Sequence, residues 1–263
     1  MVKFAELPVV LKLRRVLFIF IMLLLLLLGI QLCLTYLILP RMQIGQILLE
    51  STLDLSDEVL LSMGGLTGRE NYISLNESEI RENFESFPMI RKAYVEKQFP
   101  RTLKIILFGR SPLGLAFAGT PGESEPLAFD EYGVVFEVPG NSGYMDLPVL
   151  TGLSLEDRNG TQRLPDSLSP LLRDLMNLKK NSPHLFGQIS EISVRNNQGV
   201  FNEIRLYVNS YKLPILLSAA LSDTVMKKIL LVLDSLSSGS LMKNLEYADF
   251  RTEQVVLKTR EGN

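Results

Sequence analysis

The hydrophobic and polar positions of this chain separate into one long apolar run and a following series of short alternating segments. The run covers residues 16–39 and contains no charged side chain. As a helix it would be about 36 Å long at roughly 1.5 Å rise per residue, enough to cross a hydrocarbon core of about 30 Å. A cleaved signal peptide is the alternative, but its apolar region typically covers only about 7–15 residues and ends in small residues. The run therefore predicts one transmembrane helix.

Charges beside this run predict its orientation. Residues 1–15 carry four basic side chains and one acidic side chain, whereas residues 40–54 carry one basic and two acidic side chains. Because the more basic flank stays in the cytoplasm, we expect a single-pass type II protein with the bulk of its chain outside the cytoplasm. The tail's net charge of +3, within a chain total of −2, leaves −5 on the remainder. This acidic balance does not favour binding to nucleic acid.

Alternation after the run predicts two folded blocks. In the first block we expect the order β-α-α-β-β, a sheet covered by helices on one face. The expected strands are 42–52, 93–99 and 102–108, and the helices are 56–64 and a segment N-capped by Asn76 that places Ile80, Phe84 and Phe87 on one face. In the second block we expect helices at 167–180 and 222–237 and strands at 188–195, 201–208, 212–217, 245–251 and 254–258. These elements predict an antiparallel sheet backed by helices, so the fold class is α+β.

Few residues offer catalytic or metal chemistry. His184 is the only histidine, and Cys33, the only cysteine, lies inside the apolar run, so the exported part cannot form a disulfide. Metal sites usually combine several such ligands, and Gly64-Gly65 lacks the lysine and hydroxyl residue of a phosphate-binding loop. We therefore expect no metal, no cofactor, no small-molecule substrate and no enzymatic activity, although a serine–histidine nucleophile pair and a single-histidine base at His184 both stay formally open.

Four motifs follow one another in a fixed order along most of the chain. They are GLTGRENY at 65–72, MIRKAYVEKQFPRTLKI at 89–105 with Arg110-Ser111-Pro112, LAFDEYGVVF at 127–136, and LPVLTG at 147–152. Together they resemble the FtsQ/DivIB family of bacterial cell division proteins, which carry an FtsQ-type POTRA domain. Gly109 stands where the family usually has an acidic residue, and Ser51 where it has glycine, which puts only local turn geometry in doubt.

The resemblance implies a domain plan and a function. The plan is a cytoplasmic tail at 1–15, a transmembrane helix at 16–39, a POTRA domain at 40–112, a β domain at 113–260 and a short tail at 261–263. The implied protein is a non-enzymatic scaffold of the divisome in the cell (inner) membrane at the division septum. It would bind division proteins resembling FtsB and FtsL and so link early division proteins with septal cell-wall synthesis.

The same resemblance implies a partner-binding edge near the C-terminus, because residues 247–251 are similar to the family's aromatic-Val-Asp-Leu-Arg segment. The expected partner-binding residues are Tyr247, Asp249, Arg251, Thr252, Gln254, Val255 and Val256. Thr252 stands where an aromatic residue is common. The alternative is that Asp249 and Arg251 form only a surface ion pair, worth less than about 1 kcal/mol.

Two other functions compete with the scaffold. A POTRA-bearing transport or envelope-assembly factor would be expected to continue into a long β-barrel, for which the sequence gives no pattern. A membrane-tethered cell-wall hydrolase would need a pocket with a perturbed acid or a set of metal ligands.

Overall fold

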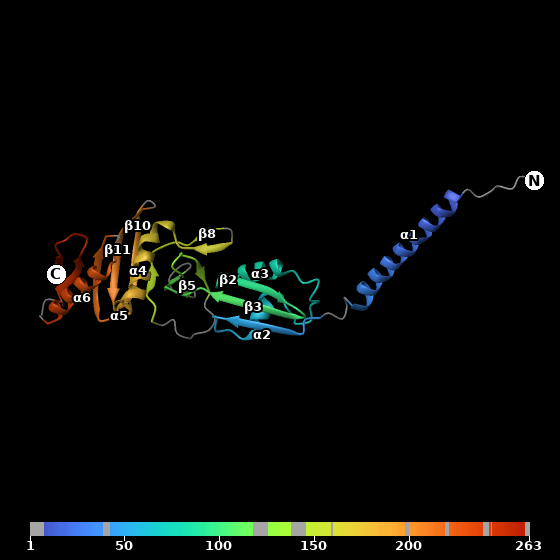
Figure 1. Ribbon diagram of the computed structural model, residues 1–263. Helices are drawn as coiled ribbons and strands as arrows, with labels where there is room; N and C mark the ends of the chain where they lie inside the picture. The colour runs from blue at the N-terminus through green and yellow to red at the C-terminus, as the bar shows by residue number, and fades with distance from the viewer. Residues whose placement is uncertain are drawn as a thin grey trace, which may run out of the picture. The chain divides into compact units, whose positions relative to one another are not determined.

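The computed structural model describes residues 8–38, 43–117, 126–137, 146–158, 160–197, 200–218, 221–238, 242 and 244–260. The chain divides into two compact units, one made of residues 1–85 and 92–107 and the other of residues 86–91 and 108–263. The mixture of helices and strands in both units (Figure 1) confirms the α+β class. The domain limits expected from the sequence stay a prediction.

The N-terminal apolar helix is present as predicted. It consists of α1 (Pro8–Cys33) followed by the π-helical turn η1 (Leu34–Ile38), and is drawn in blue in Figure 1. Residues Leu13–Tyr36 have a mean hydropathy of 3.0, and none of this segment is buried inside the protein. The core helix of a soluble protein would bury such a surface, whereas a helix with apolar residues on all sides suits a lipid environment. Leu39, the end of the expected span, lies outside the described residues.

The first unit confirms the predicted β-α-α-β-β order. Its elements are β1 (Gln46–Ser51), α2 (Asp57–Met63), α3 (Glu77–Glu85), β2 (Ile90–Gln98) and β3 (Thr102–Gly109). The strands form a sheet in the order β1-β3-β2, with β1 parallel to β3. The first two residues of β2 and the last two of β3 are counted with the second unit.

Alternate residues of β3 build the core of this unit. Leu103, Ile105 and Leu107 are fully buried, as expected where every second side chain points to the same face of a strand. Ile80 and Phe84 on α3 are also buried, and the close approach of Phe84 to Gly64 leaves no room for a Cβ atom at that glycine.

One expected member of the α3 face is misplaced. The helix ends at Glu85, so Phe87 lies beyond it and is 38% exposed. The reason is Pro88, because the residue before a proline is disfavoured in helical conformation. The apolar face of α3 therefore consists of Ile80 and Phe84 alone.

The second unit is built on a nine-stranded sheet in the order β14-β13-β12-β11-β10-β7-β4-β5-β6. Its strands are β4 (Gly114–Phe117), β5 (Pro126–Phe129), β6 (Val135–Phe136), β7 (Val149–Thr151), β10 (Ile189–Asn197), β11 (Val200–Val208), β12 (Tyr211–Leu217), β13 (Leu245–Asp249) and β14 (Val256–Thr259). The helices are η3 (Asp166–Leu168), α4 (Ser169–Asn181), α5 (Pro183–Phe186) and α6 (Asp223–Ser237), and β8 (Glu156–Arg158) and β9 (Thr161–Arg163) form a separate hairpin.

This sheet is mixed and not antiparallel throughout, which corrects the expected arrangement. Three neighbouring pairs are parallel, namely β4 with β7, β7 with β10, and β12 with β13. Two neighbouring parallel strands need a long crossover connection. In the sequence, α4 and α5 lie in the connection from β7 to β10, and α6 lies in the connection from β12 to β13. One apolar face of α6 packs into the core, with Met226, Ile229 and Leu233 fully buried.

We expect Phe84→Ala to destabilise the first unit by about 3–5 kcal/mol, because the phenyl ring is fully buried and its removal leaves a cavity. Amide hydrogen exchange of β3 in the full-length chain, held in detergent, would measure the loss. Phe87→Ala is the matched control, since that ring is partly exposed and should cost clearly less. Equal exchange rates in wild type and Phe84→Ala would show that the α3 face has been misassigned.

Candidate partner-binding edge and the Arg110 network

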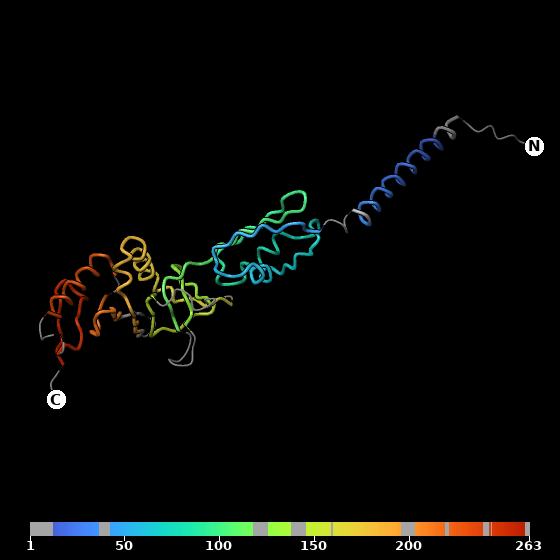
Figure 2. The backbone as a smooth tube through the Cα atoms, turned by 90° about the horizontal axis from the view of Figure 1, so that it is seen from below, coloured from blue at the N-terminus to red at the C-terminus, as the bar shows by residue number. Residues whose placement is uncertain are grey.

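The last strand of the chain lies at one end of the nine-stranded sheet. β14 pairs with β13 on one side, with Asp249 opposite Val256 and Ala248 opposite Leu257. In the sheet order no described strand follows β14 on its other side. These C-terminal strands are red in Figures 1 and 2.

One hydrogen bond shows to which side each backbone N–H group of β14 points. The Arg260 N–H group donates to the Asn244 carbonyl at 2.8 Å, so the amide of Arg260 points toward β13. Because successive amides of a strand point to opposite sides, the N–H groups of Leu257 and Thr259 point outward, away from the sheet. Val256 is 56% exposed and Leu257 38% exposed, so apolar side chains accompany this edge.

The structure divides the seven predicted partner-binding residues among three places. Tyr247 and Asp249 lie on β13, which is an inner strand and not the edge. Val256 begins β14, while Arg251, Thr252, Gln254 and Val255 lie in the connection between the two strands. The strands expected at 245–251 and 254–258 are therefore wrong at their ends, because a turn occupies the middle of this segment.

A local ion pair shapes that turn. The Arg251 guanidinium donates to both carboxylate oxygens of Asp249, with an Nη2–Oδ2 distance of 2.6 Å, and the Arg251 N–H donates to Oδ1 at 2.9 Å. Hydrogen bonding from Arg251 lowers the pKa of the Asp249 carboxyl. The Thr252 hydroxyl donates to the Gln254 carbonyl at 2.8 Å. The ion pair anticipated as the alternative is thus present, and it fixes the chain as it leaves β13.

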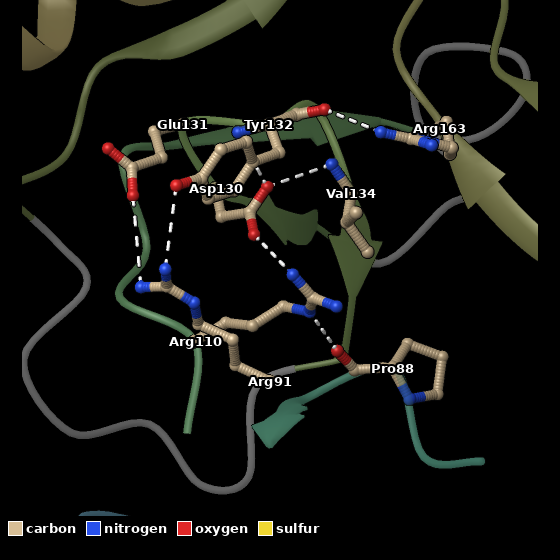
Figure 3. A network of polar contacts seen from close by, with 8 residues as sticks. All are labelled: Pro88, Arg91, Arg110, Asp130, Glu131, Tyr132, Val134 and Arg163. Atoms are coloured by element: carbon tan, nitrogen blue, oxygen red, sulfur yellow. Dashed lines mark hydrogen bonds and ion pairs between the residues drawn. The ribbon is translucent and has the colours of Figure 1, made fainter. Parts of the chain in front are cut away.

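A second polar site joins two of the sequence motifs, as Figure 3 shows. Asp130 is only 3% exposed, yet both of its carboxylate oxygens are satisfied. Oδ2 accepts a hydrogen bond from Arg110 Nη1 at 2.7 Å, and Oδ1 accepts from the N–H groups of Tyr132 and Val134, each at 2.9 Å. Arg110 Nε also donates to the Pro88 carbonyl at 2.7 Å. A buried charge with this many partners is stable, and removing one partner would be costly.

Both motifs are visible in the sequence, but no sequence pattern pairs Arg110 with Asp130. Asp130 belongs to an Asp-x-x-Gly turn in which Gly133 has a φ of 73°, a conformation that favours glycine. The available signal was this turn, because a carboxylate at its first position can accept backbone N–H groups further on. Nothing local in the sequence indicated that Arg110 would reach it.

Among the residues that the structure describes, there is no group of three or more His, Cys, Asp and Glu residues that could hold a metal ion. His184 lies in the short helix α5, and Cys33 lies at the end of α1. The expectation of a non-enzymatic protein without metal or cofactor stays a prediction.

Comparison with known proteins gives three similarities. Residues 42–108 match the family described as "POTRA domain, FtsQ-type". The cell division protein DivIB of Geobacillus kaustophilus (strain HTA426) is 31% identical over 74 residues, which is 28% of each chain. The cell division protein FtsQ of Myxococcus fulvus (strain ATCC BAA-855 / HW-1) is 26% identical over 159 residues, 58% of this chain and 52% of that protein.

These matches span about a quarter and about half of the two relatives' lengths. The matched POTRA region coincides with the β-α-α-β-β elements, from β1 to β3. The longer match extends beyond that region, as do the motifs that contain Asp130 and Gly133. The chain therefore contains an FtsQ-type POTRA domain and is similar to the cell division proteins FtsQ and DivIB.

Proposed function

We propose that this protein is a non-enzymatic scaffold of the bacterial divisome that binds partners resembling FtsB and FtsL through the β14 edge. Similarity to the cell division proteins DivIB and FtsQ, together with the one long apolar helix among the described residues, supports a membrane-anchored cell division protein. The proposed scaffold links early division proteins with septal cell-wall synthesis, at the septum. Its N-terminus lies in the cytoplasm, and the parts of both units that follow the apolar helix lie outside.

The observation that carries this proposal is the outward direction of the Leu257 and Thr259 N–H groups at the end of the large sheet. An extended segment of a partner can add a strand there, with affinity from paired backbone groups and specificity from side chains. Val256 and Leu257 supply apolar contact surface beside those groups. The turn held by Arg251 and Asp249 supports the strand from its N-terminal side.

Membrane topology gives the first test of this proposal. Protease added to cells whose outer barrier has been opened should degrade everything beyond the apolar helix and spare an epitope tag placed at residue 1, because the basic tail stays in the cytoplasm. Immunoblotting of the tag and of a C-terminal tag measures both ends. Loss of the N-terminal tag together with protection of the C-terminal tag would reverse the proposed orientation.

Proline substitution in β14 tests the binding edge. Leu257→Pro removes an outward N–H group, so it should leave the melting temperature nearly unchanged and abolish capture of the FtsB-like partner. Lys258→Pro is the matched control, since it removes an inward N–H group and should lower stability by about 1 kcal/mol or more. Thermal melting and pull-down from detergent-solubilised membranes measure the two effects separately. Full capture by a well-folded Leu257→Pro variant would exclude β14 as the edge that binds.

A further inference from the structure

A cavity of about 230 Å³ lies in the second unit beside the Arg110–Asp130 pair. Four segments of the sequence line it, and it is here called the basic cleft. The charged residues that line it are Arg91, Arg110, Asp130, Glu131, Lys179 and Lys180. All of them belong to the same compact unit.

The charges of the basic cleft do not balance. Four cationic side chains face two carboxylates, so the lining residues that the structure describes carry a net charge of +2, in a chain whose net charge is −2. Both carboxylates are already engaged, Asp130 by Arg110 at 2.7 Å and Glu131 by Arg91 at 3.9 Å. No described carboxylate of the lining is therefore left for Lys179 and Lys180.

Lys179 is held in place by neutral groups. Its ammonium donates to the Pro112 carbonyl at 2.6 Å and lies 5.8 Å from the centre of the Phe186 ring. Burial lowers the pKa of this lysine, as expected when a cation leaves water without a carboxylate beside it. The carboxylate of a ligand would stabilise the charged Lys179 ammonium in place of the water that burial removes.

Apolar groups make up most of the remaining lining of the basic cleft. Pro112, Leu113, Met176 and the ring of Tyr132 line it, together with the polar Ser111. The Arg91 guanidinium lies 5.4 Å from the centre of that ring and fixes it by a cation–π contact. The volume lies below the roughly 300–1,000 Å³ of sites for small molecules, so it suits a few side chains of a peptide better than a whole metabolite.

We propose that the basic cleft docks an acidic peptide segment of a partner protein, with a carboxylate at Lys179 and Lys180 and an apolar side chain against Met176 and Tyr132. Charge complementarity selects this occupant. The site is independent of the β14 edge and so provides the scaffold with a second contact surface.

Binding of a labelled decapeptide of alternating Leu and Glu to the full-length chain in detergent, followed by fluorescence anisotropy, tests the proposal. Lys180→Glu should weaken peptide binding by at least about tenfold, because it replaces attraction to the peptide carboxylates with repulsion. Lys180→Gln should weaken binding by less, because it only removes that attraction. Lys212→Glu, an exposed lysine on β12 of the same unit, is the matched control and should change binding less than about twofold. The peptide with Gln in place of Glu should bind weakly.

Each remaining outcome decides against the basic cleft as a peptide site. Equal weakening by Lys180→Glu and Lys212→Glu would mean unspecific attraction. Glycerol phosphate that binds in a Lys180-dependent way while the peptide does not would make the cleft a site for lipid headgroups.

Capture of the FtsB-like partner should persist in Lys180→Glu, which separates failure of this proposal from failure of the β14 edge.

Discussion

The unpaired backbone at the ends of its sheets is the constraint on which the proposed partner binding depends. Every open sheet leaves a row of backbone N–H and C=O groups unpaired at its two outer strands, and these groups must be covered or they attract other strands. In the first unit α3 covers the outer side of β2. The Ala93 N–H group donates to Glu85 at 3.2 Å and the Lys97 N–H group to Glu77 at 2.7 Å. The two glutamates lie at opposite ends of α3, so this one helix occupies the edge.

The β6 end of the large sheet is also occupied by the protein itself. Val134 forms a bridge with Arg163 of the β8–β9 hairpin, and the Leu164 N–H group donates to the Gly133 carbonyl at 2.8 Å. Like β2 and β6, β1 and β14 are outer strands in the sheet order, and no described strand pairs with their outer sides. The family resemblance favours the C-terminal edge, and the turn held by Asp249 and Arg251 gives β14 a fixed start.

Much of the first unit could be predicted from sequence because its signals are local. Asn76 and the spacing of Ile80 and Phe84 define α3, and alternation defines β3. The mixed pairing of the large sheet could not be predicted in the same way, because parallel neighbours are decided by where a crossover helix returns the chain. A strand shows the same alternation of apolar and polar residues whether its neighbour is parallel or antiparallel.

The candidate sites show the same limit. The resemblance predicted partner-binding residues near the C-terminus, but it did not predict the turn at 250–255, where the Arg251 guanidinium binds back to Asp249. Contacts between distant segments, such as Arg110 with Asp130 or Lys179 with Pro112, have no local pattern at all. Only the folded unit brings these groups together.

Amide hydrogen exchange of the full-length chain, measured with and without the FtsB-like partner, tests most directly which sheet edge is used. We expect exchange at Leu257 and Thr259 to slow strongly on binding, because their outward N–H groups become paired, while exchange along β1 and β2 stays unchanged. Slower exchange along β1 with no change along β14 would contradict the proposed edge.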